Sequence, residues 1–337
     1  MNFMSKARRI LLMLCVIGAW SCAEPSAYKA VGGVMLGTNL SLIAETATPQ
    51  GTLYAACMEI DREAKRSMSL FDPTSLLSRL NRGETDSLDG HIIRNILLAD
   101  SISRLSGGIY DITVGPLVKA WGFAGAEAET KPNIDSLLDF VGFEKIRIDG
   151  NRLVKADPRM QVDLNSIAKG YTVDLVAEML EREGVENYIV DIGGEVRCRG
   201  VNRQGNPWRI GVETPFDGNY TDGAYISRRI ALSEGALATS GNYRRYYVDA
   251  AGRKVAHTIN PRTGYSRLSP LLSATVVAAT CAEADALCTM LMAMGDDEAK
   301  RFSEAHPDLP VCLILDGGGE AYEEWLSPSM KHLIIKE

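Results

Sequence analysis

Two oxygen-bearing side chains lie one helical turn apart in the segment CAEADALCTM, residues 281–290. Asp285 and Thr289 have i, i+4 spacing, so they share one face of a helix. The residues around them are apolar, and a carboxylate in such surroundings needs a partner. A hard cation such as Mg²⁺, which binds one or two carboxylates together with substrate phosphate, is one such partner. The alternative is structural, with Thr289 bonding the carbonyl of its own i−4 residue and Asp285 capping another segment.

A second candidate is His257, one of four histidines, in the segment VAHTINPRTGYS at residues 255–266. A strand that breaks into Asn-Pro and Thr-Gly turns its last side chains toward a loop, where chemistry is commonly placed. A histidine, with an ordinary pKa of about 6.5, suits the role of a general base. A packing or surface histidine is the alternative.

The segment VDLNSIAKGYTVD, residues 162–174, predicts an anion site. Asp163 is expected to end a strand, Asn165 or Ser166 to cap a helix, and Lys169 to lie in its second turn. A helix N-terminus offers N–H groups and positive potential to phosphate. The glycine spacing of a Walker loop is absent. The alternative is a plain strand–turn–helix with a solvated lysine.

The segment GGIYDITVGPLVKAWGF, residues 107–123, places an acid among apolar residues. Asp111 lies between Tyr110 and Ile112 and needs a hydrogen-bond partner if it is buried. The aromatic residues Tyr110, Trp121 and Phe123 either stack on a planar ring or belong to the core.

Helical and strand patterns alternate along the 337 residues without a repeat or a long linker. Residues 31–46 predict a strand with a bulge at its glycines, and residues 187–200 predict a strand, a Gly-Gly turn and a strand. Helices are expected over residues 52–71, 91–108, 165–184 and 281–295. Hairpin-like connections mixed with helices indicate an α+β fold with mixed, largely antiparallel sheets and packed helices.

Charge and cysteine content narrow the function further. The formal net charge of −7 gives a nucleic-acid partner no electrostatic support. Cys15 and Cys22 belong to the N-terminal segment described below, and an odd number of cysteines then remains, which argues against a disulfide framework. These five are Cys57, Cys198, Cys281, Cys288 and Cys312.

The N-terminus resembles an export signal rather than part of the fold. Residues 1–21 combine a basic segment with an apolar run that is too short for a membrane span, and Cys22 follows as in a bacterial lipobox. Trp20 stands where a small residue is usual. We expect a lipoprotein signal peptide at 1–21, a tether at 22–29 and one domain at 30–337. The protein would be anchored by lipid to a membrane on its periplasmic side, with a soluble periplasmic protein as the alternative.

Seven segments, in order, resemble the ApbE family, the FAD:protein FMN transferases, from about residue 30 to the end. They are FDPTSLLSRLN, YDITVGPLVKAWGF, VDLNSIAKGYTVD, VDIGGEVRCRG, ALATSGNYRRYY, HTINPRTGYS and ADALCTMLMAMG. The resemblance implies an α+β fold with FAD in a cleft and Mg²⁺ at its pyrophosphate. It implies transfer of the FMN moiety of FAD to a Thr or Ser hydroxyl of an acceptor protein, with release of AMP. A Mg²⁺-dependent FAD pyrophosphatase and a non-catalytic FAD-binding lipoprotein remain alternatives.

The resemblance also assigns roles to residues. Asp285, Thr289 and the backbone carbonyl of Ser166 match the metal ligands, and His257 matches a catalytic base. The positions that match FAD contacts are Leu36, Phe71, Tyr110, Asp111, Asp163, Lys169 and Thr258. Two of them depart from the family pattern, because Leu36 replaces the usual Met and Phe71 replaces a common Tyr.

Overall fold

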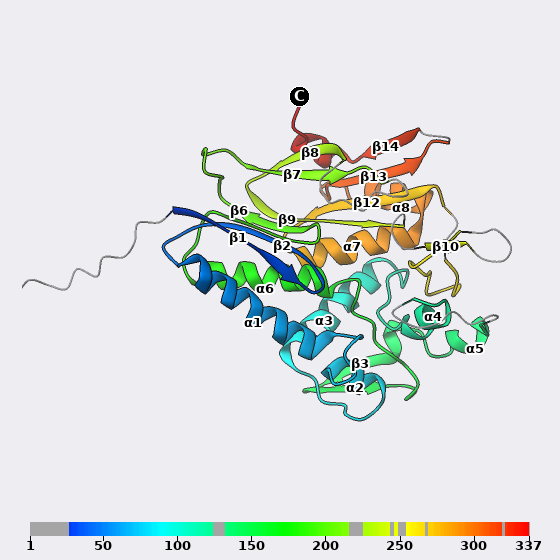
Figure 1. Cartoon of the computed structure of the whole chain (residues 1–337). Helices are drawn as coiled ribbons and strands as arrows, with labels where there is room; N and C mark the ends of the chain where they lie inside the picture. The colour runs from blue at the N-terminus through cyan, green and yellow to red at the C-terminus, as the bar shows by residue number, and fades with distance from the viewer. Residues whose placement is uncertain are drawn as a thin grey trace, which may run out of the picture.

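The computed structural model describes residues 27–123, 132–215, 225–242, 246–248, 254–266, 269–318 and 321–336. Its centre is a sheet in which every neighbouring pair of strands is antiparallel (Figure 1). The predicted α+β class with largely antiparallel sheets is therefore confirmed. In spatial order the strands are β1 (Ala27–Met35), β2 (Thr38–Thr46), β5 (Tyr188–Ile192), β6 (Glu195–Arg199), β9 (Glu234–Gly241), β12 (Leu271–Ala278), β13 (Val311–Asp316) and β14 (Tyr322–Leu326).

Helices cover one face of this sheet and a hairpin covers the other. The helical face carries α1 (Gln50–Met68), α6 (Ala168–Arg182) and α7 (Cys281–Met294), with α3 (Gly90–Leu105) packed beyond them (Figure 1). Nearly every side chain of α7 is buried, as its apolar sequence requires. The other face packs against β7 (Trp208–Glu213), β8 (Ile226–Leu232) and α9 (Pro328–Leu333).

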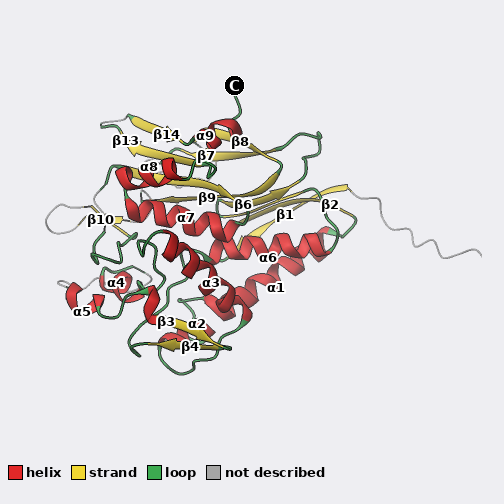
Figure 2. Ribbon diagram, turned by 180° about the vertical axis from the view of Figure 1, so that it is seen from behind, coloured by secondary structure: helices red, strands yellow, loops and turns green. Residues whose placement is uncertain are grey.

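Shorter elements complete the chain. The β3–β4 hairpin (Ile146–Asp149 and Arg152–Lys155) and α2 (Leu76–Asn81) lie at the end of the molecule away from the sheet (Figure 2). A 3₁₀ turn (Phe143–Lys145) precedes β3, and α8 (Asp296–Ala305) follows α7. The elements near the predicted site are α4 (Gly115–Ala120), α5 (Ile134–Leu138), β10 (Tyr246–Val248) and β11 (Lys254–Ala256).

The segment predicted as one strand with a bulge, residues 31–46, is instead the β1–β2 hairpin. The chain reverses at Leu36 and Gly37, whose φ angles are 51° and 78°. A leucine with positive φ is strained, and here the carboxylate of Asp61 accepts its backbone N–H at 2.7 Å. β1 begins at Ala27, so the last three residues of the predicted tether 22–29 belong to the sheet. The predicted signal peptide 1–21 and Cys22 lie outside the described residues.

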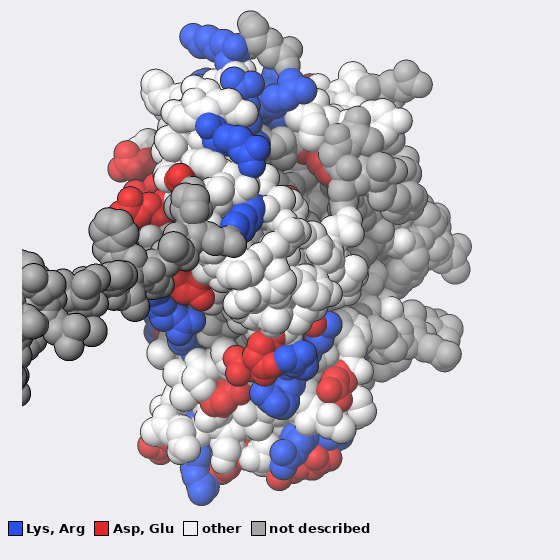
Figure 3. Space-filling view, turned by 60° about the vertical axis from the view of Figure 1, so that its left-hand side comes forward, with Lys and Arg blue, Asp and Glu red and all other residues white. Residues whose placement is uncertain are grey.

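The burial of the cysteines and the charged side chains on the surface are typical of an ordinary folded domain. All five cysteines that follow Cys22 are buried free thiols. None of the helices among the described residues has the length and apolarity that crossing a bilayer requires. On the face shown in Figure 3, acidic and basic side chains are interspersed over the lower part, and Lys and Arg gather toward the upper end.

The contact between α6 and α7 is unusually close. A Cβ atom at Gly170 would lie 2.3 Å from the carbonyl oxygen of Cys281, so only glycine fits there. One turn further along α6, the carboxylate of Asp174 accepts the backbone N–H groups of Cys281 and Ala282, each at 2.9 Å. Asp174 therefore satisfies the free N–H groups that begin α7 and complements the positive end of its dipole.

We predict that Gly170→Ala destabilises the protein by about 1–3 kcal/mol or more, because the added methyl forces α6 and α7 apart. Gly51→Ala is the matched control, since it also lies in a helix but a Cβ there meets nothing within 4 Å. It should be neutral or slightly stabilising, through the better helix propensity of alanine. Urea denaturation measures both. Equal stability of the two variants would contradict the close contact.

Candidate active site

Helix α6 delivers Lys169 to the helical face of the sheet. Its ammonium group forms an ion pair with Glu195, the first residue of β6. Glu195 follows the two-residue Gly193-Gly194 turn, in which both glycines have positive φ, as the tight hairpin requires. Only 2% of the surface of Glu195 is exposed, so this carboxyl group lies deep between α6 and the sheet.

Asp285 approaches the same turn of α6 from α7. Its Oδ2 accepts the N–H of Gly170 at 3.1 Å, and the residue is only 5% exposed. In a helix continued backwards, that N–H would donate to the carbonyl of Ser166, four residues earlier. Here that N–H goes to Asp285 instead. Among the described residues, no hydrogen bond reaches the Ser166 carbonyl oxygen, and none reaches Oδ1 of Asp285. Two oxygen acceptors are therefore left over around Gly170.

Thr289 lies one turn after Asp285, as the i, i+4 spacing predicts. Its Oγ1 contacts the hydroxyl of Ser240 on β9 at 3.3 Å. A hydroxyl from the sheet thus lies next to Thr289, one of the predicted metal ligands.

The charges at this junction strongly affect each other. Burial raises the pKa of Asp285 to about 6, although the Lys169 ammonium opposes the shift. Burial likewise raises the pKa of Glu195 to about 8, against the effect of Lys169. Burial disfavours the charge on Lys169, but the carboxylates of Glu195 and Asp285 outweigh it and raise the pKa of Lys169. The lysine therefore stays protonated.

The turn before α6 is built differently from the prediction. Asp163 does not end a strand, because the chain there makes only an isolated bridge, Val114 with Gln161. The predicted caps Asn165 and Ser166 do not cap α6, which begins at Ala168 without a side-chain cap.

The two polar side chains of this turn have other partners. The carboxylate of Asp163 accepts the N–H of Asn165 at 2.8 Å, and burial raises its pKa. The hydroxyl of Ser166 contacts the hydroxyl of Tyr110 at 2.9 Å. Asp285 and Asp163 both act electrostatically on that tyrosine, whose pKa is raised chiefly by burial. Tyr110, Ser166, Asp163 and Asp285 are therefore neighbours.

Asp111 has the hydrogen-bond partners that a buried acid requires. Its Oδ1 accepts the N–H and the hydroxyl of Thr113, at 2.7 and 2.6 Å, and its Oδ2 accepts the N–H of Phe143 at 2.7 Å. These bonds hold the loop after Tyr110. They oppose the effect of burial, which raises the pKa of Asp111. A contact of Asp111 with FAD stays a prediction.

His257 follows β11 and is half-buried, with its ring edge-to-face with Phe123 at 6.3 Å between centroids. The next residue, Thr258, donates its hydroxyl to the side-chain oxygen of Asn242 at 3.0 Å. Asn242 directly follows β9, two residues after Ser240, which contacts Thr289. Through this path the structure joins the His257 segment to the end of β9 that faces α7.

The turn after His257 is attached to the chain around α4. The indole of Trp121 donates to the carbonyl of Gly264 at 2.7 Å, and the side chain of Arg262 donates to the carbonyl of Gly107. Gly264 has φ of 75°, and a Cβ there would lie 2.3 Å from the Ile134 side chain. Figure 1 shows this region beside α4 and α7.

Phe71, where the family commonly has Tyr, is 67% exposed at the mouth of a cavity of about 260 Å³. Lys119, Gln161 and Asn81 also line this cavity. The Asn81 side chain bonds both the N–H and the carbonyl of Val162, each at 2.8 Å, so the cavity adjoins the segment that leads to Asp163. Leu36, in the turn between β1 and β2, is partly buried and packs against the core.

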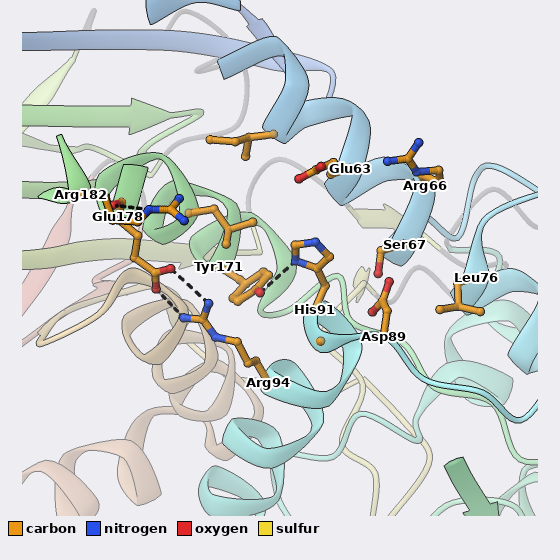
Figure 4. A pocket seen from close by; sticks show the side chains of 13 residues that line it. Glu63, Arg66, Ser67, Leu76, Asp89, His91, Arg94, Tyr171, Glu178 and Arg182 are labelled. Carbon is orange, nitrogen blue, oxygen red and sulfur yellow. Dashed lines mark hydrogen bonds and ion pairs between the residues drawn. The ribbon is translucent and has the colours of Figure 1, made fainter. Parts of the chain in front are cut away.

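A larger cavity, of about 680 Å³, lies elsewhere, between α1, α3 and α6 (Figure 4). Four of its polar side chains pair with one another: Arg94 with Glu178 through two hydrogen bonds, and His91 with Tyr171 at 3.0 Å. None of the predicted site residues lines it. The larger of the two cavities is therefore not the one beside the predicted site residues.

Sequence reasoning missed three charged residues at the junction: Glu195, Arg197 and Asp174. Arg197 pairs with Asp174 at 2.8 Å, as Glu195 pairs with Lys169. The signal was present in the segment EVRCR, because strand alternation puts Glu195 and Arg197 on one face and the apolar Val196 and Cys198 on the other. Two opposite charges on the buried face of a strand require partners.

The donor set fits a hard cation better than a soft one. No cluster of three or more His, Cys, Asp or Glu side chains suited to a metal occurs within the described ranges. A cation here would rest on one carboxylate, Asp285, with the Thr289 hydroxyl and the Ser166 carbonyl. Such an incomplete set of oxygen donors suits Mg²⁺, which keeps waters and binds substrate phosphate.

Comparison with known proteins identifies the family. Residues 36–313 match the model of the ApbE family. The FAD:protein FMN transferase of Vibrio cholerae serotype O1 is 35% identical over 333 residues, covering 94% of this chain and 95% of the relative. The chain belongs to the ApbE family. The FAD:protein FMN transferase of Haemophilus influenzae is 34% identical over 323 residues, with 91% of this chain and 92% of the relative covered.

The family relation extends to the fold. The solved structure of the flavin transferase ApbE from Vibrio cholerae matches with a TM-score of 0.78 and 33% sequence identity, over 92% of this chain and 100% of that one. The antiparallel sheet and its helices are thus those of the family.

The raised pKa values predict that, without divalent cations, stability falls as pH rises from about 4 to about 8. Below the unfolded-state pKa values, Asp285 and Glu195 are neutral in both states; between the unfolded and folded values only the native state keeps these protons. Asp285→Asn should therefore be more stable than the parent at pH 8, on the order of 1–3 kcal/mol. Urea denaturation with a chelator measures this, and the exposed Asp308→Asn is the control. The opposite result would be a parent that is less stable at pH 4.5 than at pH 8, with no such difference in Asp285→Asn. That result would contradict the argument that burial raises the pKa of Asp285.

Proposed function

We propose that this protein transfers the FMN moiety of FAD to a Thr or Ser hydroxyl of an acceptor protein and releases AMP, with Mg²⁺ as cofactor. The names of its relatives support flavin transfer. The observation that carries the proposal is the junction of α6 and α7, where the leftover oxygens of Asp285 and Ser166 lie beside the charged Lys169. Such an arrangement of one cationic side chain and hard oxygen donors suits a pyrophosphate with its cation.

Binding of FAD is assigned to side chains around this junction. Lys169 would contact the pyrophosphate, and the N-terminus of α6 adds positive potential. The exposed ring of Phe71 and its cavity of about 260 Å³ offer a stacking surface for one of the two planar rings. Leu36, Tyr110, Asp111, Asp163 and Thr258 complete the proposed FAD contacts.

The metal would be held by Asp285, Thr289 and the Ser166 carbonyl. When bound, Mg²⁺ would neutralise charge on the pyrophosphate and on the departing AMP phosphate. The protein's own contribution is positional: Gly170 and Asp174 fix α7 against α6, and Lys169 keeps its charge near the phosphate.

The reaction is a displacement at phosphorus. The acceptor hydroxyl oxygen bonds to the phosphorus of the FMN half while the bond between that phosphorus and the bridging oxygen breaks. The bridging oxygen and its electrons leave with AMP, and the hydroxyl proton passes to His257. A base in hydrogen-bond reach accelerates such a step about 10²–10⁴-fold. The turn fixed by Trp121 and Arg262 would hold the imidazole toward the acceptor.

Two other functions use the same residues. A FAD pyrophosphatase would replace the acceptor hydroxyl by water, and a carrier would bind FAD without breaking it. Mass spectrometry of the protein with FAD, Mg²⁺ and a candidate acceptor separates all three. A transferase gives an acceptor heavier by FMN, a pyrophosphatase gives free FMN and AMP, and a carrier leaves FAD intact.

We predict that His257→Ala binds FAD with near-normal affinity but transfers FMN at least about 100-fold more slowly, because the lost group acts mainly in the transition state. His306→Ala is the control, since His306, directly after α8, stacks on Phe302 and bonds the carbonyl of Phe302. FAD titration and single-turnover transfer measure the two effects. Unchanged transfer in His257→Ala would remove it as the base, and an equal loss of FAD binding would make it a binding group.

We also propose that Cys22 carries a lipid anchor on the periplasmic side of a membrane. The apolar run that ends at Ser21-Cys22 supports this proposal. Cys22→Ser should shift the protein from the membrane to the soluble exported fraction, as judged by cell fractionation. A parent protein that is already soluble would contradict the anchor.

A further inference from the structure

Lys169 lies within the influence of two buried carboxyl groups but pairs with only one of them. Its ammonium contacts Glu195, while Asp285 affects its pKa without forming an ion pair with it. Asp285 takes part in no ion pair within the described part of the chain, and its Oδ2 is bound to the N–H of Gly170. Asp285, the acid proposed to bind the metal, is thus the carboxyl group that forms no ion pair with Lys169.

Backbone geometry fixes this choice of partner. Glu195 is held at the start of β6 by the Gly193-Gly194 turn, and its pairing with Ile192 fixes its position along the strand. Lys169 is held in the first turn of α6 next to Gly170, which is packed against α7. Because α6 and β6 are both buried, neither element can shift to bring another side chain into the position of Lys169 or Glu195.

We propose that Glu195 is a positioning residue that holds the ammonium of Lys169 away from Asp285 and so keeps Asp285 available to a divalent cation. The inference rests on the metal site of the proposed function. Without Glu195, Asp285 is the remaining buried carboxylate that acts on the charge of Lys169, and the ammonium becomes an internal competitor for the cation. The carboxylate of Glu195 also adds negative charge near the cation.

The summed charge of Asp285, Glu195 and Lys169 predicts the order in which the parent and its variants bind a divalent cation. With all groups ionised, Asp285, Glu195 and Lys169 sum to −1 in the parent, since two acids and one base are present. Glu195→Gln leaves a sum of 0, Lys169→Met leaves −2, and the double variant returns to −1. Divalent cations should bind in the order Lys169→Met, then parent and double variant together, then Glu195→Gln.

The test is calorimetric titration of Mg²⁺ into the protein without FAD at pH 9, above the pKa of Glu195. We expect the dissociation constant of Glu195→Gln to rise about ten-fold or more, and the added Lys169→Met change to restore it. Glu186→Gln, at an exposed position, is the control and should bind like the parent. Thermal unfolding with a chelator checks that each variant folds.

The outcomes separate the two proposals. Parent-like Mg²⁺ binding by Glu195→Gln would overturn the role of Glu195 and leave the metal site intact. The role of Glu195 would also be overturned if Glu195→Gln bound Mg²⁺ weakly and the added Lys169→Met change did not restore binding. In that case Lys169 would not be the group that competes with the cation. No Mg²⁺ binding by the parent would overturn the metal site, and this inference with it. If Glu195→Gln does not fold, Lys169→Met alone decides, since weaker binding than the parent contradicts the proposal.

Discussion

Three ion pairs cross between α6 and β6, and the arrangement of the site depends on them: Lys169 pairs with Glu195, and Arg197 pairs with both Asp174 and Glu181. Lys169 and Asp174 are five residues apart on the helix, about 7.5 Å along its axis. Their partners Glu195 and Arg197 are two residues apart on the strand, about 6.6 Å. Because these two spacings are similar, the Lys169–Glu195 and Asp174–Arg197 pairs can form together. Buried ion pairs add little net stability, but they specify position.

The Asp174–Arg197 pair also positions α7. Asp174, held by Arg197, caps the first N–H groups of α7, and Gly170 lets the two helices touch. Asp285 then meets the N–H of Gly170, which frees the carbonyl of Ser166. Two charge pairs and one glycine thus fix the start of α7, and with it Asp285, against the first turn of α6. The strained turn at Leu36 is held by a neighbouring acid, Asp61, in a comparable way.

Much of this arrangement could be predicted from local patterns, because those patterns have local causes. The i, i+4 spacing of Asp285 and Thr289 and the apolar sequence of α7 predicted a buried helix with one polar face. The hairpin at Leu36 could not be predicted, because leucine rarely adopts positive φ and tertiary contacts impose it here. The start of α6 was also mispredicted, since Ser166 bonds Tyr110, 56 residues away, instead of capping the helix. Glu195 was missed because its partner lies on a different element.

We propose that the α6–α7 junction forms a divalent-cation site from Asp285, Thr289 and the Ser166 carbonyl. The most direct measurement is anomalous diffraction from crystals of the protein grown with Mn²⁺ and FAD. We predict one anomalous peak about 2.2 Å from Oδ1 of Asp285, with the other two oxygens also within coordination distance. A peak in the cavity between α1, α3 and α6, or full occupancy of FAD without a peak beside Asp285, would contradict it.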